Sequence, residues 1–271
     1  VGQNIDVASD GNVYNILLIG SDTRDGWYGN SDSMILASIN SQTKTIYMTS
    51  FMRDLYANIP NVGIRKLNSA YAVGGGPLLV STIESNYRID IDNYASVDFG
   101  SMANIIDLVG GVDLEVSTQE AGYINMYLDE QCRLQGLNAS DYYVTGGGIT
   151  HLNGNQAVGF ARIRYTSRGS EHSDYGRTSR QREILVQLMQ KARSLDATTL
   201  LAVVNNMLPL ITHNIDAATL TTLIANAPSY INYDIQTDRI PYDNMYTNLG
   251  EELVPDFEAT INRLHQTIYG N

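Results

Sequence analysis

The sequence is poor in cysteine, in long apolar runs and in positive charge. One cysteine, Cys132, excludes an internal disulfide and a CxxC metal site, so the chain suits either a reducing compartment or a bacterial surface protein without disulfides. The strongest apolar run, Ile16–Ile19, is far shorter than the roughly 18 residues that a transmembrane helix needs. Lysine and arginine number 17 against 29 acidic residues, a formal net charge of −12. This balance argues against a general nucleic-acid-binding protein, because such proteins usually present a broad basic face.

Several motifs of well-known enzyme classes are also absent. There is no G-x-x-x-x-G-K-[ST] loop and no G-x-G-x-x-G after a strand, so the common nucleotide-binding signals are missing. There is no G-x-S-x-G elbow and no H-E-x-x-H helix. The sequence therefore does not indicate the hydrolases and metalloproteases that these motifs mark.

Arginine, by contrast, is concentrated in one segment. Six of the fourteen arginines lie within the 21 residues from Arg162 to Arg182. A guanidinium group binds carboxylate or phosphate with two parallel hydrogen bonds and stays charged at any relevant pH. Such a basic segment in an acidic protein predicts a site for a phosphorylated or otherwise anionic ligand. The alternative is a solvated helix whose arginines are paired with nearby acidic residues, namely Glu171, Asp174 and Glu183.

The hydrophobic pattern interleaves strands and helices, and 43% hydrophobic residues in 271 suffice for a sizeable core. We expect a hairpin, and hence one α/β domain over 1–271 with a central mixed β-sheet and helices on both faces. The expected strands are 15–20, 32–40, 44–51, 94–99 and 234–240. The expected helices are 77–87, 101–109, 180–195, 198–208, 217–227 and 255–268. Residues 155–165 change from a helical to an alternating pattern, which would place Arg162 and Arg164 on one face of a strand.

Two aspartates are expected at one edge of this sheet. Asp22 follows the first strand and Asp32 opens the second, while the hairpin returns the third strand to the same edge with Arg53 and Asp54. Two carboxylates there would repel each other unless a cation lay between them. Mg²⁺ fits, because it takes one or two carboxylates together with water and substrate phosphates. The alternative is that Asp22 caps a turn and Asp32 begins a strand without binding any ligand.

The arginine-rich segment allows two helix registers. Asp174, Arg177 and Gln181 share one face if a helix begins near Ser173. A competing register caps the helix at Thr178, with Gln181 as its capping-box partner. In either register the helix N-terminus adds a partial positive charge to the arginines.

Taken in order, eight motifs resemble those of the LytR-CpsA-Psr family of bacterial cell-envelope proteins. They span about residues 14–195, and residues 196–271 would supply the helices that complete the domain. The motifs are N-I-L-L-I-G-S-D-T-R (15–24), S-D-S-M-I-L-A-S-I-N (31–40), S-F-M-R-D (50–54), K-L-N-S-A-Y-A-V-G-G (66–75), V-D-F (97–99), G-G-V-D (110–113), H-L-N-G-N-Q-A-V-G-F-A-R-I-R (151–164) and D-Y-G-R-T-S-R-Q (174–181).

The resemblance implies a phosphotransferase at the outer face of the bacterial cytoplasmic membrane. Such proteins move an anionic glycopolymer, for example wall teichoic acid or capsular polysaccharide, from an undecaprenyl-pyrophosphate carrier to peptidoglycan. They form a phosphodiester and use Mg²⁺, for which Mn²⁺ can substitute. Members usually carry an N-terminal membrane anchor, so we expect one to precede residue 1. Nothing in the sequence resembles a DNA-reading helix.

Site residues are carried over from the resemblance by position. Asp22 and Asp32 match the metal-binding carboxylates, and Lys66 and Asn68 match a lysine motif near the phosphates. The expected pyrophosphate clamp consists of Arg53, Arg162, Arg164 and Arg177, with Arg24, Arg180 and Gln181 as additions. The sequence departs from the family pattern at Met52, where a proline is usual, and in longer links at 164–174 and 117–148.

The expected mechanism is in-line displacement at phosphorus, with Arg53 and the other arginines stabilising the charge on the phosphoryl oxygens. The acceptor hydroxyl needs a base, for which Asp54 and Asp174 are the candidates. The polyprenyl chain needs an apolar tunnel, expected between the sheet and the helices at 77–87 and 101–109, although these apolar residues would also suit a simple core. Two other functions use the same residues, namely hydrolysis of the pyrophosphate and non-catalytic binding of phosphorylated glycans. All three require Arg162 and Arg164 in a cationic pocket, and the enzymatic functions also require this pocket to meet Asp22 and Asp32.

Overall fold

The structure, a computed structural model, describes residues 7–21, 29–168 and 173–270. The chain divides into two compact units, of which the first contains the residues up to Asp98 and those from Thr212 onward. The second unit is Phe99–Ile211. The prediction that 1–271 form a single domain stays a prediction. Within the described residues, no helix combines the length and the apolar composition that crossing a bilayer requires.

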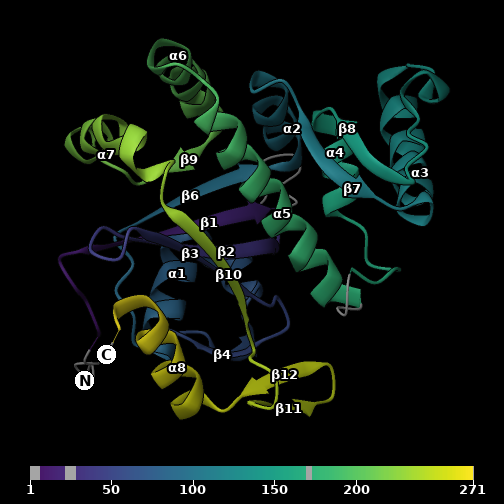
Figure 1. The fold of residues 1–271 in the computed structure, drawn as a ribbon. Coiled ribbons are helices and arrows are strands. Elements are labelled where there is room, and N and C mark those ends of the chain that lie inside the picture. Colours follow the sequence, from purple (N-terminus) through teal and green to yellow (C-terminus); the bar gives the residue numbers. More distant parts are fainter. Residues whose placement is uncertain (1–6, 22–28, 169–172, 271) are drawn as a thin grey trace. The chain divides into compact units, whose positions relative to one another are not determined.

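The first unit is built on a six-stranded mixed sheet in the order β10-β3-β2-β1-β6-β9 (Figure 1). The middle strand β2 is antiparallel to β1 and β3, whereas β6 is parallel to β1 and β10 is parallel to β3. The strands are β1 (Val13–Ser21), β2 (Ser31–Asn40), β3 (Thr45–Phe51), β6 (Asn93–Asp98), β9 (Thr212–His213) and β10 (Asp234–Ile240). The predicted mixed sheet and its hairpin are confirmed.

Three helices of the described chain pack around this sheet. Helices α1 (Ser69–Tyr87) and α8 (Phe257–Tyr269) lie on one face of the sheet, and α7 (Ala217–Tyr230) lies toward the other (Figure 1). Alternate side chains of β1 point into the core, where Leu17 is 0% exposed, and α1 places Ile83 against the sheet at 0% exposure. Each such side chain contributes about 1.5–3 kcal/mol of hydrophobic stabilisation. Two small hairpins complete the unit: β4 (Tyr56–Ile59) with β5 (Gly63–Lys66), and β11 (Tyr246–Leu249) with β12 (Glu252–Pro255).

Helix α1 begins at Ser69, earlier than the expected start at residue 77. The expected start lies just after a kink inside the helix. Gly74 and Gly75 have non-helical backbone angles, and the φ of 63° at Gly75 is one that favours glycine. Pro77 follows after one more residue, Gly76. A proline lacks the amide hydrogen that a helix start leaves unpaired in any case, so it suits the position where the helix resumes. Pro77 therefore lies just after the kink inside α1, and it does not begin the helix as the sequence predicted.

The second unit packs helices around a two-stranded antiparallel ribbon, β7 with β8. Its elements are α2 (Phe99–Leu108), β7 (Val112–Val116), α3 (Thr118–Gln135), the 3-10 turn η1 (Ala139–Tyr142), β8 (Gly148–Leu152), α4 (Gly154–Ala161), α5 (Ser173–Arg193), α6 (Ala197–Met207) and the 3-10 turn η2 (Leu208–Leu210). The core of this unit is formed by side chains from its helices and its ribbon, among them Ile106 of α2, Leu114 of β7, Ile124 of α3 and Phe160 of α4. Helix α3 fills much of the stretch 117–148 for which the sequence predicted no element.

The arginine-rich segment differs from the prediction at its start. Helix α4 ends at Ala161, and residues 162–167 form neither helix nor strand, so the predicted strand carrying Arg162 and Arg164 is wrong. Arg162 continues the helical turn, because its amide donates to the carbonyl of Val158 at 3.2 Å. Helix α5 begins at Ser173, which confirms the earlier of the two registers. Thr178 lies inside the helix and does not cap it.

One glycine of the second unit is required by a close approach between two helices. A Cβ atom on Gly154, at the start of α4, would lie 2.0 Å from the backbone carbonyl oxygen of Ala103 in α2. We therefore expect Gly154→Ala to destabilise the protein by about 1–3 kcal/mol, because backbone atoms cannot move aside cheaply. The measurement is urea unfolding followed by circular dichroism.

The matched control is Gly122→Ala in α3, where a Cβ atom meets nothing within 4 Å. Alanine is the better helix former by about 0.8–1 kcal/mol, so this variant should be as stable as the parent or more so. Equal stabilities for the two variants would contradict the close approach of α2 and α4.

Candidate functional site

In the first unit, charged side chains gather at the end of the β2–β3 hairpin, as the topology predicted. Asp32 is the second residue of β2, and Arg53 follows β3. The Arg53 guanidinium lies 3.7 Å from Oδ1 of Asp32 and 3.3 Å from Oδ2 of Asp54. All three side chains are about one fifth to one quarter exposed. The hairpin thus delivers two carboxylates and a guanidinium to the same edge.

The lysine motif lies beside this group. Nζ of Lys66 contacts Oδ1 of Asp54 at 3.1 Å and Oε2 of the exposed Glu251 at 3.1 Å. Hydrogen bonds to Asp54 and Glu251 raise the pKa of Lys66 above its usual value, so the lysine stays charged. The buried Asn68 is fixed through its backbone: its amide donates to Arg53 O, and its carbonyl accepts from the amide of Ser31 at 3.5 Å. This set (Asp32, Arg53, Asp54, Lys66 and Asn68) is called the hairpin group below.

Two predicted residues, Asp22 and Arg24, lie outside the described residues. Of the predicted metal pair, the structure therefore describes Asp32 and not Asp22. Among the residues that the structure describes, no cluster of three or more His, Cys, Asp or Glu residues could hold a metal ion. Mg²⁺ needs fewer protein ligands than that, and the partly exposed carboxylate of Asp32 offers the hard oxygen that it prefers. The residues present are compatible with Mg²⁺, and the metal stays a prediction.

In the second unit, two arginines converge on one carboxylate. Nη2 of Arg177 lies 3.4 Å and Nε of Arg164 lies 3.6 Å from Oδ1 of Asp174. Arg177 is 2% exposed. Asp174 and Arg177 are neighbours on one face of α5, as their spacing predicted, and Gln181 follows one turn later and is partly exposed.

Arg162 is held in a different way, by aromatic rings. Its guanidinium carbon lies 4.8 Å from the ring centre of Phe99 and 5.1 Å from that of Tyr127. The negative faces of aromatic rings attract a cation without neutralising its charge. Within the described chain, no carboxylate forms an ion pair with Arg162. Arg162, Arg164, Asp174 and Arg177 are called the arginine group below, and its three guanidinium groups suit an anionic ligand.

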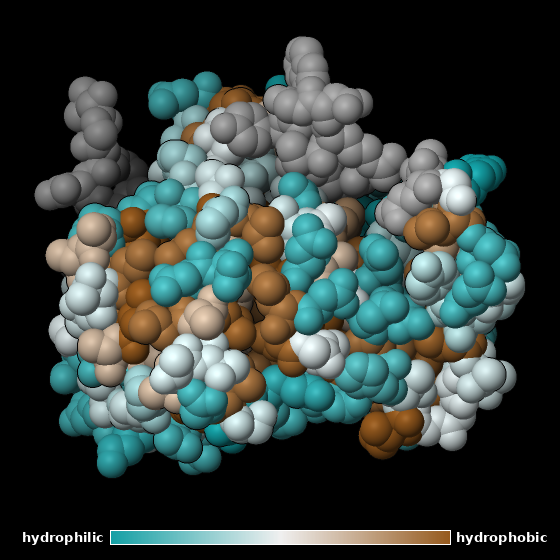
Figure 2. Space-filling view, turned by 90° about the horizontal axis from the view of Figure 1, so that it is seen from above, coloured by the Kyte–Doolittle hydropathy of each residue, from teal (hydrophilic) through white to brown (hydrophobic). Residues whose placement is uncertain are grey.

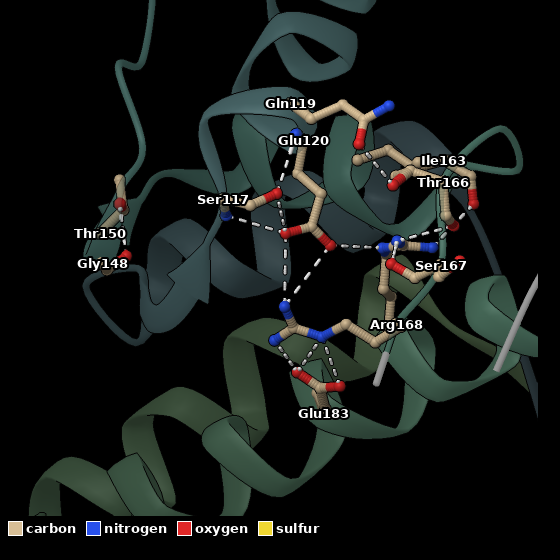
Figure 3. A network of polar contacts seen from close by, with 11 residues as sticks. Ser117, Gln119, Glu120, Gly148, Thr150, Ile163, Thr166, Ser167, Arg168 and Glu183 are labelled. Carbon is tan, nitrogen blue, oxygen red and sulfur yellow. Dashed lines mark hydrogen bonds and ion pairs between the residues drawn. The ribbon is translucent and has the colours of Figure 1, made fainter. Parts of the chain in front are cut away.

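Arg180, by contrast, is fully buried at 0% exposure, and its guanidinium bonds to protein atoms. Nε donates to Oε1 of Glu120 at 2.9 Å, and the two terminal nitrogens donate to three backbone carbonyls (Figure 3). The predicted pyrophosphate contact of Arg180 therefore finds no support in this geometry. The sequence analysis missed Glu120 and the rings of Phe99 and Tyr127. Only Glu120 had a readable signal, since Ser117 and Glu120 have the spacing of a capping box.

A cavity of about 410 Å³ lies in the first unit, at the opposite end of β1 from the hairpin group. Asp10, Asp90 and Asp92 are among its lining residues. Burial raises the pKa of Asp92, and the Asp90 carboxylate raises it further. The negative charge of this cavity excludes it as the anion site predicted from the arginines.

Comparison with known proteins gives consistent matches over nearly the whole chain. The model described as the LytR_cpsA_psr family matches residues 2–264. A protein of Oceanobacillus iheyensis, named polyisoprenyl-teichoic acid--peptidoglycan teichoic acid transferase TagU, is 33% identical over 268 residues, which are 95% of this chain and 75% of the relative. For three further relatives, the chain spans only 48% to 60% of their length.

Solved structures show the same fold. TagT bound to LIIa-WTA superposes with a TM-score of 0.73 at 21% identity, covering 96% of this chain and 91% of that one. A LytR-CPS2A-psr family protein, YwtF (TagT), with bound octaprenyl pyrophosphate lipid superposes with a TM-score of 0.68 at 21% identity, covering 96% and 92%. At such identities the likeness establishes the fold alone.

The arginine group generates a binding prediction. We expect Arg162→Ala to weaken the binding of inorganic pyrophosphate about tenfold, because one charge-assisted contact contributes roughly 1.5–3 kcal/mol. Isothermal titration calorimetry measures the effect. Arg133→Ala is the matched control, since Arg133 is an exposed arginine at the end of α3 in the same unit. Equal losses in the two variants would show that only net charge matters and would contradict a specific site.

Proposed function

The chain belongs to the LytR-CpsA-Psr family, and from this premise we propose that it transfers an anionic glycopolymer from an undecaprenyl-pyrophosphate-linked carrier to peptidoglycan. The name of the TagU relative describes such a transfer of teichoic acid. The polyprenyl pyrophosphate bound by a protein of the same fold supports the same class of donor. Peptidoglycan as acceptor implies action at the outer face of the cytoplasmic membrane, with an N-terminal anchor as in other members.

The observation that carries this proposal is the presence of three arginines in the arginine group, each held by a carboxylate or by aromatic rings. A pyrophosphate-linked donor brings several negative charges to one place. The two guanidinium groups beside Asp174 and that of Arg162, held by aromatic rings, can neutralise them. Arg177 is 2% exposed and Arg162 rests on two rings, so both are held before a ligand arrives. Guanidinium groups fixed in advance stabilise developing charge on phosphoryl oxygens without reorganising during the reaction.

The bond changes follow from the substrates. An acceptor hydroxyl attacks the phosphorus that carries the glycopolymer, the bond from this phosphorus to the bridging oxygen of the pyrophosphate breaks, and polyprenyl phosphate leaves. A phosphate is a good leaving group, so positioning and charge neutralisation carry the catalysis. Asp54 and Asp174 stay the two candidates for accepting the hydroxyl proton. Each also holds two cations of its group, which keeps those cations in place.

We assign metal binding and additional positive charge to residues of the hairpin group. We propose that Asp32, with Asp22, holds Mg²⁺, which would supply positive charge to the phosphate oxygens when bound. Arg53 and Lys66 are each fixed by Asp54, and both add positive charge in the first unit. Mn²⁺ should substitute for Mg²⁺, since both prefer oxygen ligands.

The polyprenyl chain requires apolar contacts that the core does not already use. The side chains of Leu79, Ile83 and Tyr87 in α1, expected beside a tunnel, are each 0% exposed and pack as core. The tunnel stays a prediction. Helix α6, in contrast, buries none of its side chains, and its Leu201 is 45% exposed. Hydrophobic surface is visible in the view from above (Figure 2).

The test is turnover of a polyprenyl-pyrophosphate-linked glycan with a peptidoglycan fragment and Mg²⁺. We expect Asp32→Asn to lower Mg²⁺-dependent transfer by about 100-fold or more, because the metal loses a charged ligand. The control is Asp243→Asn, since Asp243 is a 78% exposed aspartate that pairs with Arg239 in the same unit. This variant should retain full activity.

Three results would contradict the proposal in different ways. Unchanged turnover in Asp32→Asn would remove Asp32 from the metal site. Release of glycan phosphate in the presence of acceptor, with no phosphodiester formed, would identify a hydrolase. Binding of the donor without any turnover would identify a non-catalytic glycan-binding protein.

A further inference from the structure

A buried network of charges surrounds Glu120 in the second unit (Figure 3). Its centre is Glu120, which is 2% exposed and accepts hydrogen bonds from Arg180 at 2.9 Å and from Arg168 at 3.3 Å. The amide and the hydroxyl of Ser117 also donate to Glu120, each at 2.9 Å. Burial raises the pKa of Glu120, but these hydrogen bonds outweigh it and leave the pKa below its ordinary value. The carboxylate is therefore charged and held from several sides.

Besides Glu120, Arg180 also binds three backbone carbonyls. Its Nη1 donates to the carbonyl of Ile163 at 3.3 Å, and its Nη2 donates to those of Thr166 and Ser167 at 3.1 and 3.0 Å. These carbonyls belong to the irregular segment 162–167, which has no helix or strand to satisfy its backbone. A single fully buried side chain thus fixes the path of the chain that carries Arg162 and Arg164.

The segment is also fixed at its far end. Nε of Arg168 donates to both carboxylate oxygens of Glu183 in α5, at 2.9 and 3.1 Å. The guanidinium groups of Arg168 and Arg180 both lie against the ring of Phe160, at 5.2 and 5.7 Å from its centre. Two arginines and two glutamates therefore balance in charge, and the network adds no net charge to the neighbouring arginine group.

We propose that Arg180 and Glu120 are positioning residues for the anion site: they hold the backbone of 163–167 so that Arg162 and Arg164 present their guanidinium groups to phosphate oxygens. This inference rests on the proposed function, since it assigns the network to the binding of the same donor. It divides the arginine-rich segment by role: Arg162, Arg164 and Arg177 contact the ligand, and Arg168 and Arg180 hold the chain.

The alternative is that the Arg180–Glu120 pair contributes only stability. Buried ion pairs often contribute little net stability, and breaking one by removing a partner is costly. A double-mutant cycle separates the two roles, because residues that act through one another are not additive, whereas independent residues are. The cycle combines Arg180→Lys with Arg162→Ala. Lysine keeps the positive charge beside Glu120, but its single ammonium group cannot also reach all three carbonyls.

The measured quantity is the Kd for inorganic pyrophosphate, together with the thermal midpoint of each variant. We expect Arg180→Lys to fold and to weaken binding about tenfold. In that background, Arg162→Ala should cost less than about twofold, although it costs about tenfold in the parent. If Arg180→Lys does not fold, Glu120→Gln takes its place, since its one amide oxygen can still accept from Ser117 while the carboxylate that pairs with Arg180 is lost. Lys191→Met, which removes a surface ion pair with Asp113, is the control and should combine additively with Arg162→Ala.

The outcomes separate the two proposals. If Arg180→Lys and Glu120→Gln lower the thermal midpoint but their effects on Kd multiply with that of Arg162→Ala, the positioning role is overturned and the proposed transfer stands. If the coupled loss of binding appears in a protein that transfers no glycan to peptidoglycan, the proposed transfer is overturned and the positioning role stands. Binding unchanged by Arg180→Lys and by Glu120→Gln would also overturn the positioning role.

Discussion

The ion pair between the buried guanidinium of Arg180 and the carboxylate of Glu120 determines how the arginine-rich segment can fold. Positive charges so close in sequence repel one another, and a charge removed from water is stable only when it is paired and fully hydrogen-bonded. Glu120 meets this requirement for Arg180 and Arg168 together. The carbonyls of the irregular segment complete the hydrogen bonding of Arg180, so the segment and the charge stabilise each other.

The same constraint is compatible with an anion site, as we propose, in a chain that is acidic overall. Glu120 and Glu183 pair with Arg168 and Arg180, which hold the chain, whereas Arg162 rests on the rings of Phe99 and Tyr127. Aromatic rings hold a cation in place and leave its charge for a ligand. In the first unit, Asp54 has a related role, because its two oxygens fix Arg53 and Lys66 on opposite sides. A solved structure of the same fold holds octaprenyl pyrophosphate lipid, which is the class of donor that we propose for this arrangement.

Local patterns in the sequence were sufficient for much of the fold. The run Asn15–Gly20 and the two β-rich stretches around Ser41 predicted the central strands, because strand periodicity and turn residues act over a few positions. The register of α5 is one of the two that the spacing of Asp174, Arg177 and Gln181 and the possible cap at Thr178 had left open. The hairpin topology also predicted that Asp32 and Arg53 would meet.

The wrong predictions concern features that depend on contacts between residues distant in sequence. The alternation of Arg162, Ile163 and Arg164 resembles that of a strand, but the segment is irregular, and its carbonyls accept hydrogen bonds from Arg180 in place of a neighbouring strand. Glu120 lies 60 residues from Arg180 in the sequence, and no local pattern predicts that these two residues pair. For the same reason the sequence could not separate arginines that contact a ligand from arginines that hold the chain. The meeting of the arginine group with Asp22 and Asp32 stays a prediction, since Asp22 lies outside the described residues.

The most direct measurement is a crystal structure of the protein with a polyprenyl pyrophosphate and Mg²⁺. We expect pyrophosphate oxygens within hydrogen-bonding distance of Arg162, Arg164 and Arg177, with the metal bound to Asp32 and Arg180 still bonded to Glu120. A pyrophosphate bound away from Arg162 and Arg164, or bound directly by Arg180, would contradict this expectation.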